Sequence, residues 1–160
     1  MQLRELIQNI DVVNISEFSD SKEILNITND SREVAPGSLY VAITGFSVDG
    51  HNYIIDAVNA GAVAIVVDKD ENYFDELCRS NNVSKIRVKD SRKAFADFSC
   101  AFYEHPSKKL TLVGITGSNG KTTTSFYVKN LFETAGYKTG LLGTISNIVG
   151  DFKEDSQLTT

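Results

Sequence analysis

Hydrophobic and polar positions along this chain follow two patterns in turn, one typical of strands and one typical of helices. The pattern predicts strands at residues 24–27, 38–43, 62–67 and 85–88, of which 62–67 is a nearly all-apolar run. Apolar residues at helical spacing predict helices over residues 3–7, 53–60, 73–79 and from about 91 to 102. Because strands and helices follow one another in turn, the pattern predicts a layered α/β domain.

Helix-end signals and an aromatic face support this interpretation. Gly61 is placed to end the helix over 53–60 in a left-handed conformation. Asp90 or Ser91 could cap the last helix, before Pro106. We interpret the apolar face of that helix as protein core rather than as a platform for bases, and its residues are Ala94, Phe95, Phe98, Ala101 and Phe102.

The pattern restarts after a polar segment, 105–109, that has the character of a linker. A strand over 110–115 is predicted, followed by a glycine loop, a helix closed by Gly136 and a strand near 139–145. We therefore predict one domain in residues 1–106 and the first part of another in 107–160. Two strands and one helix are too few for a nucleotide-binding α/β sheet, so we expect the second domain to be incomplete and the chain to be a piece of a longer protein.

Composition narrows the classes of protein to consider. The chain is 41% hydrophobic and 23% charged, with no apolar run of the roughly 20 residues that span a bilayer. We expect a cytoplasmic monomer that does not bind membranes. A formal net charge of −5 argues against a nucleic-acid partner. Cys78 and Cys100 are expected to be buried, reduced thiols. The acidic run Asp68, Asp70, Glu71 and Asp75 is expected to be a solvated face.

The most informative segment for function is 114–124, Gly-Ile-Thr-Gly-Ser-Asn-Gly-Lys-Thr-Thr-Thr. It lies between a predicted strand and a predicted helix, where glycines let backbone amides face phosphate oxygens. Lys121 could reach the β- and γ-phosphates as the catalytic cation, and the Thr122 hydroxyl could bind Mg²⁺. The strict P-loop formula has glycine where Ile115 stands. The predicted ATP-binding residues are Gly117, Ser118, Asn119, Gly120, Lys121, Thr122 and Thr123.

This loop resembles the ATP loop of the Mur ligases, which build the stem peptide of peptidoglycan, and folylpolyglutamate synthetases have a similar one. Segments 29–32 (Asn-Asp-Ser-Arg), 36–42 (Pro-Gly-Ser-Leu-Tyr-Val-Ala) and 49–51 (Asp-Gly-His) resemble the uridine-nucleotide domain of two Mur ligases. These two add the third residue and the terminal dipeptide of the stem, and the synthetases lack this domain. Segment 140–145 with Leu158-Thr159-Thr160 is similar to the third-residue ligase.

The resemblance implies an α/β fold with a small uridine-nucleotide domain before a P-loop-type ATPase domain. It implies an ATP- and Mg²⁺-dependent ligase of cell-wall synthesis, and hence a role in cell shape and division. The substrates would be UDP-MurNAc-L-Ala-D-Glu and a diamino acid, meso-diaminopimelate or L-lysine, joined through an acyl phosphate. These 160 residues alone would not catalyse the reaction. The implied substrate-binding residues are Asn29, Ser31, Phe46, Ser47, Val48, Leu158, Thr159 and Thr160.

Three alternatives remain open from the sequence. The chain could belong to the ligase that adds the terminal dipeptide. It could be a nucleotide-binding module without ligase activity. It could also be a different P-loop enzyme, such as a kinase, with an unrelated N-terminal domain.

Overall fold

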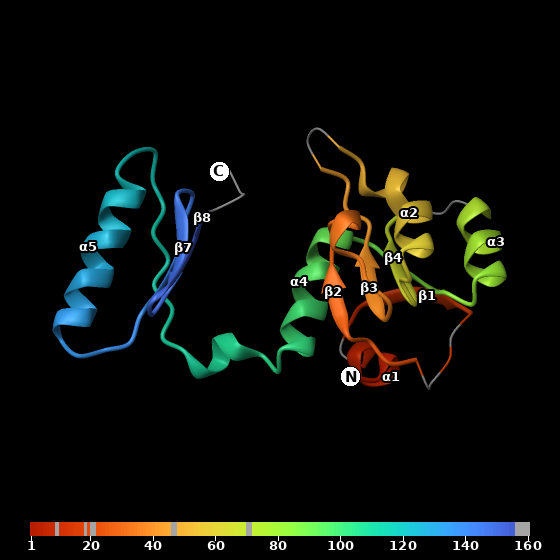
Figure 1. Cartoon of the computed structure of the whole chain (residues 1–160), viewed down its shortest axis with the longest axis horizontal. Helices are drawn as coiled ribbons and strands as arrows, with labels where there is room; N and C mark the ends of the chain where they lie inside the picture. Colours follow the sequence, from red (N-terminus) through yellow and green to blue (C-terminus); the bar gives the residue numbers. More distant parts are fainter. Residues whose placement is uncertain (9, 18, 20–21, 46–47, 70–71, 156–160) are drawn as a thin grey trace. The chain divides into compact units, whose positions relative to one another are not determined.

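The chain divides into two compact units, Met1–Leu110 and Thr111–Thr160 (Figure 1). The computed structural model describes residues 1–8, 10–17, 19, 22–45, 48–69 and 72–155. The boundary predicted after residue 106 falls in the short 3-10 helix η3 (Pro106–Lys109), just before this division. In the described ranges, no helix is long and apolar enough to cross a membrane.

The first unit is built on a five-stranded sheet with the strand order β1-β5-β4-β3-β2. Strands β2 to β5 are parallel, and β1 runs antiparallel to β5 at one edge. The carboxyl ends of the four parallel strands therefore lie along one edge of the sheet. The strands are β1 (Val12–Ser16), β2 (Asn26–Thr28), β3 (Ser38–Val41), β4 (Ala64–Val67) and β5 (Ser84–Val88).

Helices cover both faces of this sheet (Figure 1). Leu39 and Val41 pack in a cluster with α1 (Leu3–Ile7) and α4 (Ser91–Phe102). Tyr40 and Ala42 point the other way, into a cluster with α2 (Ile54–Asn59) and α3 (Asn72–Ser80). Because successive residues of an extended chain face opposite sides, β3 and the residue that follows it supply both clusters. The result is a three-layer α/β/α unit, which confirms the predicted fold class.

Most of the predicted elements of the first unit are confirmed. Gly61 has the expected left-handed conformation, with φ +103°. The carboxylate of Asp90 accepts a hydrogen bond from the backbone N–H of Lys93, 2.9 Å away, and so caps α4. Phe98 is fully buried, and Phe95 and Phe102 pack against the same cluster. The interpretation of this aromatic face as core is therefore confirmed.

Strand β1 and the environment of one cysteine were not predicted correctly. β1 carries polar and half-exposed residues at a sheet edge, so it lacks the apolar run that indicates a buried strand. Cys78 is buried as expected, but Cys100 is exposed. Cys100 follows the core residue Phe98 by two positions, about 200° around the helix axis. It therefore lies on the outer side of α4.

The described residues of the second unit form one α-helix, α5 (Lys121–Thr134), and a three-stranded antiparallel sheet. The sheet consists of β6 (Gly140–Leu142), β7 (Ser146–Val149) and β8 (Phe152–Asp155). The predicted helix is confirmed, with Gly136 in a left-handed conformation at its end. The predicted strand near 139–145 corresponds to β6, whereas β7 and β8 were not predicted.

The strand predicted over residues 110–115 is wrong. These residues form neither helix nor strand, and Leu110, Leu112 and Val113 are exposed. A strand needs neighbours to pair its backbone N–H and C=O groups, and β6 and β8 pair only with β7 among the described strands. Leu141 and Ser146 are the only buried residues that the structure describes in this unit.

Candidate nucleotide-binding sites

The glycine loop of the second unit leads directly into α5. Gly117 and Gly120 both have positive φ angles, +146° and +80°, which glycine adopts without a steric cost. Gly120 is the cap residue of α5. The ammonium group of Lys121 turns back and donates a hydrogen bond to the carbonyl oxygen of Gly117, 2.9 Å away. The loop is thus closed on itself beside the start of the helix.

The start of α5 can bind an anion. The first backbone N–H groups of an α-helix have no acceptor within the helix, and the helix dipole favours negative charge there. Lys121 and Thr122 are partly exposed at this end, and Ser118 and Asn119 are exposed in the loop before it. The predicted ATP-binding residues therefore form a continuous, accessible set that suits a polyphosphate. The Thr122 hydroxyl could supply one oxygen ligand to a magnesium ion.

The predicted uridine-binding residues of the first unit lie in segments that begin at one edge of the sheet. β2 and β3 are adjacent parallel strands, so the segments after them start at the same edge. Asn29 and Ser31 follow β2, and Val48 follows β3. Asn29 and Val48 are exposed, and Ser31 is partly exposed. Ligands of open α/β sheets bind outside the carboxyl ends of strands, which fits this edge.

Hydrogen bonds shape the turn that carries Ser31. The carboxylate of Asp30 accepts from the backbone N–H of Arg32 at 2.9 Å and from its guanidinium group at 2.5 Å. These hydrogen bonds lower the pKa of Asp30 to about 2. The Thr28 hydroxyl accepts from the backbone N–H of Asp30 at 3.0 Å and donates to the Glu33 carboxylate at 3.1 Å. Ser31 begins the 3-10 helix η1 (Ser31–Glu33) in the middle of this network.

After β3, described residues on either side of positions 46–47 bond to one another, and we call them the loop base: Thr44, Gly45, Val48 and Asp49. The N–H of Gly45 donates to the carbonyl oxygen of Val48 at 2.8 Å. The N–H of Gly50 donates to the carbonyl oxygen of Ile43 at 2.9 Å. A Cβ atom at Gly50 would lie 2.7 Å from the backbone nitrogen of Ile43, so only glycine fits this close approach.

Five predicted substrate residues cannot be placed at either site. Phe46 and Ser47 of the segment after β3 lie outside the described residues, and so do Leu158, Thr159 and Thr160. Their substrate contacts stay predictions.

A charged cluster behind the loop base was missed by sequence reasoning. Asp49 pairs with Lys69 and lies 2.7 Å from the Nδ1 atom of the buried His51. Burial would raise the pKa of Asp49, but hydrogen bonds from Lys69 and His51 lower it well below its usual range. Asp68 accepts a hydrogen bond of 2.7 Å from the hydroxyl group of Ser91. The Asp-Gly-His sequence was a signal for this cluster, but it did not reveal the partners that follow β4 and begin α4.

The acidic run was expected to be a solvated face, but two of its residues, which are partly exposed, also bind partners within the first unit. Asp68 bonds Ser91, and Asp75 pairs with the buried Lys85 at 2.5 Å. Sequence spacing could not show these contacts, because their partners come from other elements. Asp70 and Glu71 lie outside the described residues.

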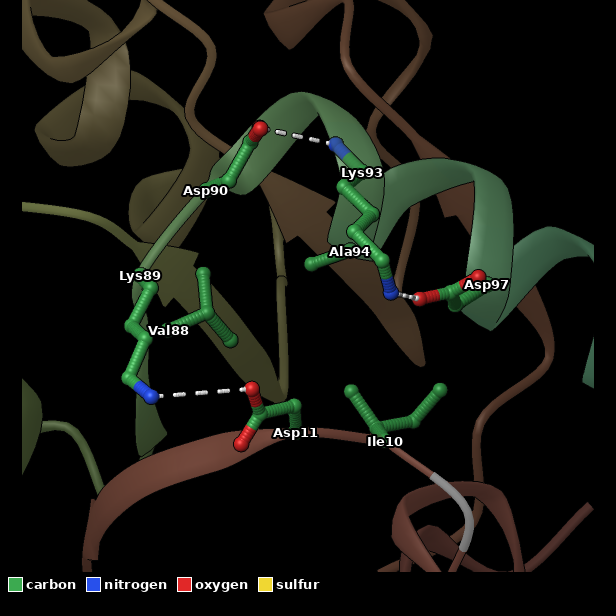
Figure 2. Close-up of a pocket in the computed structure, with 8 residues that line it drawn as sticks. All are labelled: Ile10, Asp11, Val88, Lys89, Asp90, Lys93, Ala94 and Asp97. Carbon is green, nitrogen blue, oxygen red and sulfur yellow. Dashed lines mark hydrogen bonds and ion pairs between the residues drawn. The ribbon is translucent and has the colours of Figure 1, made fainter.

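A small cavity of about 40 Å³ lies between β1, β5 and the start of α4 (Figure 2). Its charged side chains are paired within the cavity wall: Lys93 with Asp97 at 2.5 Å, and Lys89 with Asp11 at 3.8 Å. A cavity of this size has room for a few water molecules but not for a nucleotide. It contains none of the predicted site residues. The full lining is Ile10, Asp11, Val88, Lys89, Asp90, Lys93, Ala94 and Asp97.

Fold and loop together define an α/β protein with a glycine loop of the phosphate-binding type. Residues 23–103, from the approach to β2 to the end of α4, match the family described as Mur ligase family, catalytic domain. The chain belongs to the Mur ligase family. The matched residues lie within the first unit. The glycine loop lies in the second unit and is therefore separate support for the family.

Individual proteins that are similar to this chain are Mur ligases as well. The chain is 44% identical over all 160 residues to the UDP-N-acetylmuramoyl-L-alanyl-D-glutamate–2,6-diaminopimelate ligase of Clostridium botulinum, and it covers 32% of that protein. The chain thus spans about a third of the length of the curated relatives it matches. A crystal structure of MurF from Acinetobacter baumannii shares its fold, with a TM-score of 0.64 at 22% identity over 83% of this chain and 27% of that one. MurF from Thermotoga maritima, solved in complex with ADP, matches with a TM-score of 0.50 at 29% identity, over 71% of this chain and 24% of that one.

Proposed function

We propose that this chain binds the two nucleotides used by a ligase that adds a diamino acid to UDP-MurNAc-L-Ala-D-Glu. ATP transfers its γ-phosphate to the terminal carboxylate of that substrate, which yields an acyl phosphate and ADP. The amino group of the diamino acid then attacks the acyl carbon and displaces phosphate, so an amide bond forms. The reaction belongs to cytoplasmic cell-wall synthesis, and the protein acts in it as a monomer.

One observation carries the proposal: 44% identity extends over the whole chain to a ligase named for this substrate and for 2,6-diaminopimelate. The aligned residues include both the sheet edge of the first unit and the glycine loop of the second. We therefore take diaminopimelate as the diamino acid. The likeness to MurF at 22% identity supports the fold alone.

The first unit takes the uridine end of the substrate in this proposal. Asn29, Ser31 and Val48 are accessible at the carboxyl edge of β2 and β3. Their task is positioning, since binding energy at the remote uridine end orients the reacting carboxylate. Phe46 and Ser47, with Leu158, Thr159 and Thr160, complete the proposed substrate contacts.

The second unit takes ATP. Backbone amides of Gly117 to Thr123 bind the phosphates, and Lys121 leaves the Gly117 carbonyl to contact the transferred phosphoryl group. The Thr122 hydroxyl would hold Mg²⁺, which neutralises charge on the phosphate oxygens. The contribution of the loop is electrostatic, because phosphoryl transfer requires positioning and charge stabilisation.

Nuclear magnetic resonance titrations of the whole chain with UDP and, separately, with Mg²⁺-ADP test the proposal. We expect UDP to shift the amide signals of residues 29–32 and 48, and Mg²⁺-ADP to shift those of residues 114–124. Ser31→Ala should weaken UDP binding only, and Lys121→Ala should weaken ADP binding only. If both nucleotides shift the same set of amides, or if millimolar UDP shifts none in the first unit, the proposed division of sites is wrong.

A further inference from the structure

We propose that His51 is a positioning residue, whose buried ring holds the loop base in the shape that presents Val48 to the substrate. The link to substrate rests on the proposed function. The link to the loop base rests on contacts within the first unit alone.

One side of the imidazole ring is bonded to the loop base. His51 is 5% exposed, and its Nδ1 atom lies 2.7 Å from Oδ1 of Asp49. Hydrogen bonds hold the pKa of Asp49 low, so its ionised carboxylate can only accept. The Nδ1 atom must therefore carry the proton and donate it to this hydrogen bond.

The other side of the ring lies against the end of β4. The Nε2 atom is 3.3 Å from Oδ1 of Asp68, without the alignment of a hydrogen bond. Asp68 is itself fixed, because Ser91 donates to it from its hydroxyl group at 2.7 Å and from its backbone N–H at 3.3 Å. The ring thus fills the space between the loop base and a carboxylate anchored to the first turn of α4.

Asp49 links the imidazole ring to the rest of the loop base by hydrogen bonds. The same Oδ1 atom also accepts from the backbone N–H of His51 at 3.1 Å and from the Thr44 hydroxyl at 3.3 Å. Lys69 bonds the second carboxylate oxygen. A guanidinium nitrogen of Arg92 donates to the carbonyl oxygen of Thr44 at 3.3 Å. Without the ring, Asp49 could turn toward Lys69, and its bond to Thr44 across the loop base would be lost.

Three substitutions separate positioning from simple core packing, since the ring also lies beside Phe74, with ring centroids 6.4 Å apart. His51→Asn keeps an N–H donor near the place of Nδ1. His51→Gln keeps one near the place of Nε2 and loses the bond to Asp49. His51→Leu keeps apolar volume and loses both ring nitrogens, and with them the bond to Asp49.

Amide hydrogen exchange on the whole chain measures how stable the hydrogen bonds of the loop base are, and it needs no ligand. We expect the amides of Gly45 and Gly50 to exchange at least about tenfold faster in His51→Leu and His51→Gln, with His51→Asn within about threefold of the original protein. The amide of Ala42, bonded to the carbonyl oxygen of Val66 at 2.9 Å, should be unchanged. Equal acceleration at all three amides, or none at Gly45 and Gly50, would overturn the inference. If His51→Leu does not fold, the comparison of Gln with Asn decides.

UDP affinity of the same variants tests the link to substrate. We expect the dissociation constant to rise at least about tenfold for Gln and Leu, and to stay within about threefold for Asn. Unchanged affinity in the Gln variant, with a loosened loop base, would show that His51 does not act on the substrate site. If the original protein does not bind UDP, the proposed function fails, and hydrogen exchange still decides the role of His51.

Discussion

The ammonium nitrogen of Lys85 lies 2.5 Å from Oδ1 of Asp75, and this ion pair joins β5 to α3. The two ends of the pair differ in environment: the side chain of Lys85 is 5% exposed and that of Asp75 is 38% exposed. Lys85 lies opposite Ile65 in the parallel sheet, on the face that packs against α2 and α3. The charge of Lys85 is thus placed beside a hydrophobic cluster.

Removal of the carboxylate should therefore cost more stability than removal of the ammonium group. Asp75→Ala leaves a buried charge without its partner, and we expect the free energy of unfolding to fall by about 1–3 kcal/mol. Lys85→Met replaces the charge with an apolar side chain of similar length and should cost less. Urea denaturation of the two variants measures the difference. A larger loss in Lys85→Met would show that the pair itself, rather than the burial of one charge, stabilises the unit.

The low pKa of Asp49 predicts a pH dependence of stability. Burial opposes ionisation of this carboxyl group, but hydrogen bonds from Lys69 and His51 outweigh burial and lower its pKa in the folded state. A carboxyl group with a lowered pKa stabilises the fold above its unfolded pKa of about 3.9 and loses that contribution as the pH falls further. The original protein should thus be more stable than Asp49→Asn at pH 7, and the difference should shrink below about pH 4.

Urea midpoints at pH 7, 5, 4 and 3 give this comparison. Asp11→Asn is the control, because the side chain of Asp11 is 73% exposed and its ion pair with Lys89 spans 3.8 Å. It should change stability little at any pH. A difference for Asp49→Asn that grows as the pH falls would have the wrong sign for this account.

The two cysteines should react at very different rates. Burial raises the pKa of the Cys78 thiol to about 11, whereas Cys100 is exposed on α4. The thiolate is the reactive form, so a thiol reagent at pH 8 should modify Cys100 quickly and Cys78 only after unfolding. Ellman's reagent counts both, and Cys100→Ser should abolish the fast phase. Two fast thiols in the folded protein would contradict the burial of Cys78.

Sequence patterns predicted most of the first unit because its core strands are short segments with apolar residues between polar turns. Strand β4 is buried along its whole length, so its composition alone indicates it. Strand β1 lies at an edge with partly exposed side chains, and its pairing with β5 joins residues more than 60 positions apart. No local pattern contains that information.

The segment before the glycine loop shows the opposite error. Residues 110–115 have the composition of a buried strand, yet a strand also requires partners, and none of the described strands pairs with them. The same distinction between local signals and tertiary contacts applies to the site residues. The glycine loop is contiguous and could be predicted from sequence, whereas the contact of His51 with Asp68 depends on the order of strands in the sheet.

Lys121 provides the most direct test that this chain works as the nucleotide-binding part of a ligase. A chimera would carry this chain in place of the matching residues of the Clostridium botulinum ligase, to which it is 44% identical. The measurement is the single-turnover rate of phosphate release from ATP with saturating UDP-MurNAc-L-Ala-D-Glu and diaminopimelate. We expect Lys121→Ala to lower this rate at least about 10²-fold, or about 2.7 kcal/mol, because transfer loses a cation at the phosphoryl group. Lys138→Ala, at an exposed lysine of the same unit, should leave the rate unchanged. A Lys121→Ala chimera within about fivefold of the unsubstituted chimera would contradict the account, since that loss is only about 1 kcal/mol.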